Sequence, residues 1–255
     1  MPRVKPVAHD EQLSLVDHLD ELRSRLFVAI GAFVLAFAFC GWQNHRILEI
    51  VNKPLPDRYD QPLTFGVTEP FTTTFTNAAY AAILLALPVI LYQLYAFVLP
   101  AFSPTEKRVA KPLLLMSPLL FVAGVVFCYF VVLPPATEFL LSFNASEFNT
   151  QVRARDYYSF STMTMLAMGL GFQVPIAIIA LVRLQIVSVE QLRHHRRYAI
   201  LACAVLAALL PTIDPVTMLL EMVPLLILYE LSILLAASFG RSDAKGSDVV
   251  AAEGS

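Results

Sequence analysis

The segment PFTTTFTNAAYAAILLALPVILYQLYAFVLPAFSPT, residues 70–105, decides the fold class because it contains no Asp, Glu, Lys or Arg. A helix rises about 1.5 Å per residue, so about 20 apolar residues cross the roughly 30 Å hydrocarbon core of a bilayer. Transmembrane β-strands are about 10 residues long and alternate in polarity, which this segment does not do. It therefore predicts a membrane-spanning α-helix, which satisfies its own backbone hydrogen bonds in lipid.

Five further apolar segments predict an all-α, polytopic membrane protein with six spans. Hydrophobic residues make up 57% of the 255 residues and charged residues 15%, whereas soluble domains carry about 45–50% and about 25%. The predicted spans are residues 26–43, 71–98, 112–133, 157–182, 198–213 and 216–238. The fifth is too short for a full crossing, so we expect spans five and six to form a short hairpin whose outer turn, Pro211–Pro215, sinks into the bilayer or thins it.

The distribution of basic residues predicts that both termini lie in the cytoplasm. Thirteen of the 18 Lys and Arg residues fall before span one, between spans two and three, between spans four and five, or in the tail. Basic residues concentrate in cytoplasmic loops, which sets this orientation. We expect one membrane domain over residues 1–240 and a disordered cytoplasmic tail over residues 241–255, because the tail is small and polar.

The segments outside the spans also carry predictions. Leucines at positions 15, 19, 22 and 26 recur at helical spacing, which predicts an amphipathic helix that lies on the inner surface and runs straight into span one. The external loop, residues 43–69, is expected to cap the outer face and has room for short helices. No cleavable signal or transit peptide is recognised, which favours a bacterial plasma membrane.

The sequence shows no motif for bond-breaking chemistry. A nucleophile elbow, a P-loop, a Rossmann fingerprint and an HExxH pair are all missing from it. We therefore expect no enzyme, metal or cofactor, but a protein that moves something across the bilayer or a membrane scaffold. The net charge of −2 gives no reason to expect nucleic acid as a partner. The cysteines, Cys40, Cys128 and Cys203, fall in apolar spans and are expected to be small core residues.

Two carboxylates are predicted at the cytoplasmic ends of neighbouring helices. Glu21 lies in HLDELRSR, residues 18–25, and Glu106 lies in PAFSPTEKR, residues 100–108. A planar guanidinium matches a carboxylate in bidentate fashion, and the membrane interface lowers the dielectric constant. Together they would therefore bind a pair of guanidinium groups. The alternative, which the residues alone favour, is that Glu21 pairs with Arg25 four residues later and Glu106 with its basic neighbours.

Several motifs occur in an order that is shared with a known family. They are HLDELRSRL at 18–26, TEPF at 68–71, LPVILYQ at 87–93 followed by Phe97 and Pro100, EKR at 106–108, YFVVLP at 129–134, FQVP at 172–175, and Asp214, Pro224 and Tyr229–Glu230. With six predicted spans, this order resembles the TatC family, the polytopic core of the twin-arginine protein translocase. The resemblance covers nearly the whole chain.

The resemblance implies a function and a set of partners. It implies recognition, at the cytoplasmic face, of folded cargo whose signal peptide carries two consecutive arginines, with Glu21, Glu106 and Phe97 as signal-peptide-binding residues. It also implies an oligomeric complex with single-span TatA- and TatB-type subunits and export driven by the proton-motive force. A small-solute secondary transporter is the alternative, but the sequence shows no internal repeat of the kind that such transporters carry. A non-transporting scaffold is a further alternative.

Polar residues within the spans are the remaining candidates, because charge at bilayer depth is costly and often functional. The family usually has Glu where this chain has Gln173, whereas span six carries Glu221. We expect Gln173 and Glu221 to face one shared concavity and to contact a partner's transmembrane helix. The alternative is that Glu221 lies near the outer surface in contact with water.

Four more residues are expected to be structural or functionally sensitive. Glu230 is expected to act as a buried acceptor for a neighbouring helix or backbone group. Asp214 precedes Pro215 and is expected to be a turn or cap residue, and the resemblance marks it as sensitive. Glu69 opens span two and Pro88 lies within it. Because proline kinks helices, Pro88 and six further prolines in or at the ends of spans predict curved helices around a concave face.

Overall fold

The computed structural model describes residues 15–59, 61–99, 104–148, 150–183, 185–208 and 214–252. Most of these residues are helical, the rest form connecting loops, and no strand occurs among them beyond an isolated bridge between Leu63 and Arg153. The predicted all-α class is therefore confirmed. The helices before the midpoint are α1 (Leu15–Trp42), α2 (Asn44–Asn52), the 3₁₀ turn η1 (Asp57–Tyr59), α3 (Glu69–Val98) and α4 (Pro104–Phe127). After them come η3 (Cys128–Val132), α5 (Leu133–Ser142), α6 (Ala154–Gly171), α7 (Val174–Arg183), α8 (Val189–His194), α9 (Arg196–Ala208) and α10 (Pro215–Ala252).

Among the described residues, five helical stretches are long and apolar enough to cross a membrane. They are His18–Trp42, Glu69–Val98, Leu115–Ser142, Ala154–Arg183 and Pro215–Ala237. Helix α9 does not qualify, since its 13 residues reach only about 20 Å at helical rise. This agrees with the prediction that the fifth span is too short. A six-span count stays a prediction.

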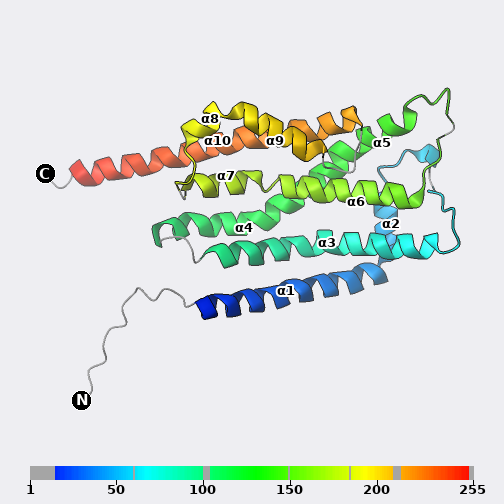
Figure 1. Cartoon of the computed structure of the whole chain (residues 1–255), viewed down its shortest axis with the longest axis horizontal. Coiled ribbons are helices and arrows are strands. Elements are labelled where there is room, and N and C mark those ends of the chain that lie inside the picture. Colours follow the sequence, from blue (N-terminus) through cyan, green and yellow to red (C-terminus); the bar gives the residue numbers. More distant parts are fainter. Residues whose placement is uncertain are drawn as a thin grey trace, which may run out of the picture.

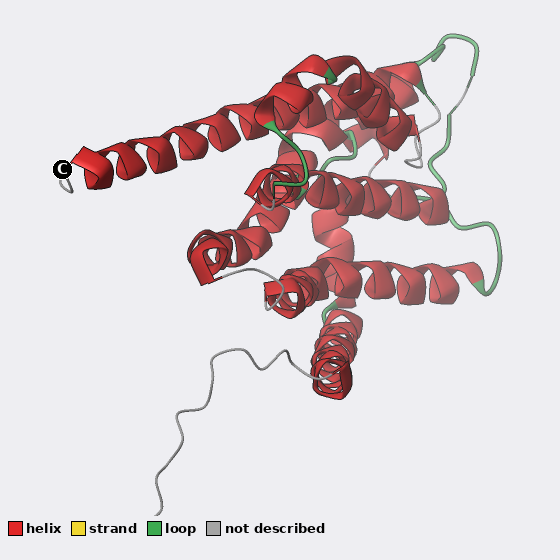
Figure 2. Cartoon of the chain, turned by 60° about the vertical axis from the view of Figure 1, so that its left-hand side comes forward, coloured by secondary structure: helices red, strands yellow, loops and turns green. Residues whose placement is uncertain are grey.

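The helices alternate in direction and lie side by side (Figure 1). Helix α1 packs on α3, α3 on α4 and α6, and α7 on α10. Figure 1 shows the start of α1, the end of α3, the start of α4 and the end of α7 together on the left, whereas α2 lies towards the right. Helices α9 and α10 form a hairpin whose described part stops short of the right-hand ends of α3 and α6. Figure 2 shows that α1 lies at one edge of the assembly of helices.

The third span extends beyond its predicted end and continues past two prolines. Residues 112–133 were predicted to span, but the helix continues through η3 and α5 to Ser142. Pro134 and Pro135 stand in the first turn of α5, directly after a π-helical turn, and each lacks the N–H that a continuing helix would use. The π-helical turn Cys128–Val132 precedes them and absorbs the change in hydrogen bonding. The loop predicted to start near residue 134 therefore starts after Ser142.

The fourth span is two helices instead of one. Helix α6 ends at Gly171, and α7 begins at Val174, just before Pro175. Proline disfavours helical geometry in the residue before it and lacks an N–H for the turn behind it. The N–H groups of Phe172 and Gln173 bond back to the carbonyls of Met168 and Leu170. The break therefore turns Gln173 out of the regular helical register.

Long helices lie near both ends of the described chain. Helix α1 runs unbroken from Leu15 to Trp42, so the predicted amphipathic segment and span one are a single helix. Helix α10 extends to Ala252, and the disorder expected of the tail after residue 240 stays a prediction.

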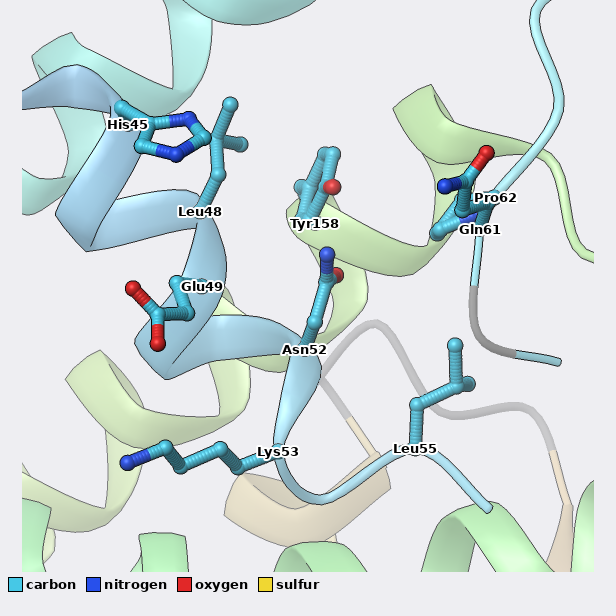
Figure 3. A pocket seen from close by; sticks show the side chains of 9 residues that line it. All are labelled: His45, Leu48, Glu49, Asn52, Lys53, Leu55, Gln61, Pro62 and Tyr158. Atoms are coloured by element: carbon cyan, nitrogen blue, oxygen red, sulfur yellow. The ribbon is translucent and has the colours of Figure 1, made fainter. Parts of the chain in front are cut away.

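The loop between α1 and α3 contains α2 and η1 and lies at one end of the bundle (Figure 1). That this end is the outer face stays a prediction. Hydroxyl groups tie α2 to the membrane helices: Tyr129 Oη donates to the Ile50 carbonyl at 2.8 Å, and Tyr157 Oη donates to the Val51 carbonyl at 2.7 Å. Beside α2 lies a cavity of about 660 Å³, with Tyr158 of α6 at its back wall (Figure 3).

Candidate functional site

The predicted signal-peptide residues of α1 and α3 come together where α1 begins and α3 ends. His18, Glu21 and Arg25 follow each other at three- and four-residue intervals and therefore share one face of α1. Gln93 and Phe97 are four residues apart on α3 and share a face in the same way. We call these five residues the lip, because they lie at the end of the bundle where the cytoplasmic face is predicted.

Contacts between side chains join the α1 residues of the lip to its α3 residues. The His18 ring stacks on the Phe97 ring with centroids 4.3 Å apart and planes within 11°. His18 Nδ1 lies 3.9 Å from Glu21 Oε2. Phe97 is thus linked to Glu21 through His18, which sequence reasoning had treated only as part of a motif.

Glu21 holds a guanidinium group from its own helix. Arg25 Nη2 donates to Glu21 Oε1 at 2.6 Å, and Arg25 Nε donates to the same oxygen at 3.0 Å. Arg25 Nη1 donates to Gln93 Oε1 at 3.0 Å. The side chains of Glu21 and Arg25 are 28% and 25% exposed, so the pair is open to solvent on one side. The alternative that Glu21 pairs with Arg25 is therefore what the structure shows, and Gln93 is a further member that sequence reasoning missed.

Glu106 stands in the first turn of α4, which follows α3 along the chain. Its side chain lies outside the described residues, so its place relative to Glu21 stays a prediction.

Gln173 is bonded to α4 instead of facing an open surface. Ser117 Oγ donates to Gln173 Oε1 at 2.7 Å, and Gln173 Nε2 donates to the Ser117 carbonyl at 3.2 Å. Gln173 is 8% exposed and Ser117 is fully buried. This reciprocal pair fixes the break between α6 and α7 against α4. Ser117 gave no sequence signal, because a single serine in an apolar run is common.

Glu221 is fully buried within the chain. The alternative that Glu221 lies at the surface in contact with water is therefore wrong. Since both Gln173 and Glu221 are buried, neither side chain presents an open polar surface, as the predicted concavity would require. Their contact with a partner helix stays a prediction.

Glu69 organises the loops at the opposite end of α3. Its Oε1 accepts from Arg153 Nε at 2.6 Å, and its Oε2 accepts from the N–H groups of Phe65 and Gly66 at 2.8 and 3.1 Å. The carboxylate beside it raises the pKa of the Arg153 guanidinium above its ordinary value. The loop before α3 is thereby joined to the loop before α6, which is a structural role.

The other candidates have local roles. Asp214 Oδ1 accepts from the Thr217 N–H at 2.7 Å and caps the start of α10. Glu230 accepts from Arg196 Nη2 of α9 at 2.8 Å, but its side chain is 45% exposed, so the expectation of a buried acceptor is wrong. Pro88 lies inside the continuous helix α3.

Neither metal nor redox chemistry is suggested by the described residues. No group of three or more His, Cys, Asp or Glu side chains within them is arranged to hold a metal ion. The three cysteines are unpaired and buried, as expected of core residues. What the lip can do chemically is bind a guanidinium group between a carboxylate and an amide oxygen.

Comparisons with known proteins agree along nearly the whole chain. The family model described as "Sec-independent protein translocase protein (TatC)" matches residues 17–224. The protein of that name from Desulforapulum autotrophicum is 35% identical over 246 residues, which cover 94% of this chain and 89% of that protein. A chloroplastic protein of the same description from Arabidopsis thaliana is 34% identical over 229 residues, which cover 89% of this chain and 67% of that protein. The crystal structure of a twin arginine translocase receptor, TatC, matches with a TM-score of 0.75 and 36% identity, covering 86% of this chain and 98% of that one.

Proposed function

Because the chain belongs to the TatC family of Sec-independent protein translocase proteins, we propose that its lip, together with Glu106, binds the paired arginines of signal peptides on folded cargo. Glu21 and Glu106 are the guanidinium acceptors in this proposal, and Phe97 forms an aromatic wall beside them. The family is a component of a protein translocase, and the chain is a multi-pass membrane protein with several apolar helices.

One observation carries the proposal: Glu21 already binds a guanidinium group, that of Arg25, with two donors at 2.6 and 3.0 Å. The carboxylate therefore has the geometry and exposure that an incoming arginine requires. A lysine has no planar fork and forms a weaker match at such a site. The lip is thus suited to arginine more than to positive charge in general.

The remaining parts of the proposal concern partners and location. Single-span TatA- and TatB-type subunits would pack against the membrane helices near Gln173 and Glu221, and the proton-motive force would drive export. The protein would lie in a bacterial plasma membrane with both termini in the cytoplasm. The asymmetry of Lys and Arg supports this orientation, as does the gathering of the corresponding helix ends at one end of the bundle.

The proposal is tested by peptide binding to the full chain in lipid nanodiscs. A fluorescent signal peptide with two arginines should bind, and its two-lysine version should bind more weakly. Glu21→Gln, Glu106→Gln and Phe97→Ala should each weaken binding, and Glu21→Gln and Glu106→Gln should stop export of a twin-arginine reporter in cells. Glu190→Gln is the matched control, since it removes an exposed carboxylate on α8. Normal export in the Glu21→Gln, Glu106→Gln double variant would contradict the proposal and favour a scaffold or a solute transporter.

A further inference from the structure

A single guanidinium group bridges the two helices of the lip. Arg25 gives two of its donors to Glu21 Oε1 and a third to Gln93 Oε1, each at 3.0 Å or less. The acceptor that the proposed function assigns to a signal peptide is therefore already occupied by a residue of the chain itself. Arginine has five donors in a fixed fork, so it can bind two acceptors at once in this way.

We propose that Arg25 is the resting occupant of the receptor carboxylate, which a signal peptide must displace, and that Gln93 retains Arg25 after displacement. This inference rests on the proposed function, since it names a specificity device in the same site. Arg25 thereby sets the threshold that a cationic peptide has to exceed. It acts as a specificity-determining residue through its hydrogen bonds to Glu21 and Gln93.

The contacts explain why the occupant can be displaced. Glu21 and Arg25 are four residues apart on one helix and each about a quarter exposed. Exposed pairs of this kind are weak, because solvent screens them. Yet Arg25 is tethered four residues away, so its effective concentration at Glu21 is high. Arg25 therefore competes at Glu21 with every cationic peptide, so weakly binding peptides are excluded and strongly binding peptides can displace it.

The same competition favours consecutive arginines over single charges. A peptide with one arginine exchanges one guanidinium for another at Glu21 and gains little. A second arginine adds a contact for which Arg25, a single side chain, offers no competition. A lysine lacks the planar fork, so it replaces two donors with a single-point contact.

Gln93 lowers the cost of displacement. When Arg25 leaves Glu21, its bond to Gln93 Oε1 remains, so the charged group is not left without an acceptor. Gln93 lies one turn before Phe97 on α3. Arg25, held by Gln93, therefore stays beside Phe97 instead of binding Glu21 again.

The test measures dissociation constants of two-arginine and two-lysine peptides for the full chain in nanodiscs. Arg25→Gln should tighten binding of the two-arginine peptide about three- to fivefold, the scale of one exposed ion pair. It should also reduce the preference for arginine over lysine, which a purely structural role would not change. Arg25→Lys keeps the charge without the planar guanidinium. It should change the affinity for the two-arginine peptide and the preference for arginine in the same directions, but by less. It also serves as the test should Arg25→Gln not fold.

Two further variants separate displacement from charge and from packing. Arg23→Gln removes the same charge from the same helix, but Arg23 lies over the Phe27 ring and not on Glu21. It should leave the preference for arginine unchanged. Gln93→Met keeps the length but removes the acceptor, so it should weaken peptide binding in the wild type and have no effect in the Arg25→Gln background.

The possible results point in different directions. If Arg25→Gln weakens binding or changes it no more than Arg23→Gln, Arg25 is a packing residue and the inference is wrong. If Gln93→Met weakens binding equally in both backgrounds, Gln93 contacts the peptide directly and the retention step is wrong. If the wild type does not bind the two-arginine peptide, or Glu21→Gln leaves its binding unchanged, the proposed function itself fails.

Discussion

Helices α4 and α6 approach each other closely at two glycines, Gly124 and Gly169, and replacing one of them should destabilise the protein. An ideal Cβ on Gly124 would lie 2.9 Å from the Gly169 Cα, 2.9 Å from the Met168 carbonyl oxygen and 2.8 Å from Phe172 Cγ. Carbon atoms pack best at about 3.5–4.0 Å. Since two of these neighbours are backbone atoms, Gly124→Ala has to push the helices apart by at least about 0.6 Å.

The expected cost follows from what overpacking does in other cores. Inserting a methyl group where neighbours cannot move costs about 1–3 kcal/mol. For a protein of this size, about 2–4 °C of melting temperature corresponds to each kcal/mol, which predicts a fall of about 2–12 °C. The melting temperature is measured on purified protein in detergent by the loss of the monodisperse elution peak after heating.

The chain offers a matched control on another helix. An added Cβ on Gly31 of α1 would meet nothing within 4 Å. Gly31→Ala makes the same chemical change and should leave the melting temperature unchanged or raise it slightly, because Ala favours helix over Gly. If Gly124→Ala and Gly31→Ala both melt at the wild-type temperature, the close approach of α4 and α6 is not as the structure has it.

Three other substitutions test local interactions in the same melting or proteolysis assays. Ser117→Ala removes the hydroxyl donor to Gln173 but keeps the backbone bond, so it should cost about 0.6 kcal/mol, the average for a hydrogen bond between membrane helices. Asp214→Ala removes the cap on the Thr217 N–H and should cost about 1 kcal/mol, whereas Asp214→Asn should retain most of it. Glu69→Ala should speed proteolytic cleavage of the loop before α3. Glu69→Gln keeps an acceptor for the loop N–H groups and should speed cleavage less. Equal cleavage of wild type and Glu69→Ala would contradict the role of Glu69 in joining the two loops.

The sequence predicted the features that depend on the bilayer itself. Charge-free length fixes where a helix can cross, so the all-α class, the bounds near residues 71–98 and the short α9–α10 hairpin followed from composition. The pairing of Glu21 with Arg25 also followed, because four-residue spacing on a helix is a local rule. These predictions need no knowledge of which helices touch.

Features that depend on contacts between helices were not predictable in the same way. Gln93 and Arg25 are 68 residues apart in the sequence, and only the packing of α1 on α3 shows that they are partners. Ser117 and Gly124 likewise look like ordinary members of an apolar run. Lipid supplies no hydrophobic force between helices, so small and polar residues decide their packing. A membrane helix is apolar on all its faces, so the face that contacts a neighbouring helix gives no periodic hydrophobic pattern in the sequence.

The geometry of the lip depends on one interface of small residues. Helix α1 packs against α3 through a cluster of buried small side chains: Ala36 and Cys40 of α1 with Ala78, Ala82 and Ala86 of α3. Because α1 lies at the edge of the bundle and α3 is its main neighbour, this cluster sets how near Glu21 comes to the end of α3. A shift of α1 along α3 would break the bond from Arg25 to Gln93 before it disturbed the local pair with Glu21. The retention of Arg25 by Gln93 is therefore coupled to how α1 and α3 pack within the membrane, whereas the pair of Arg25 with Glu21 is local to α1.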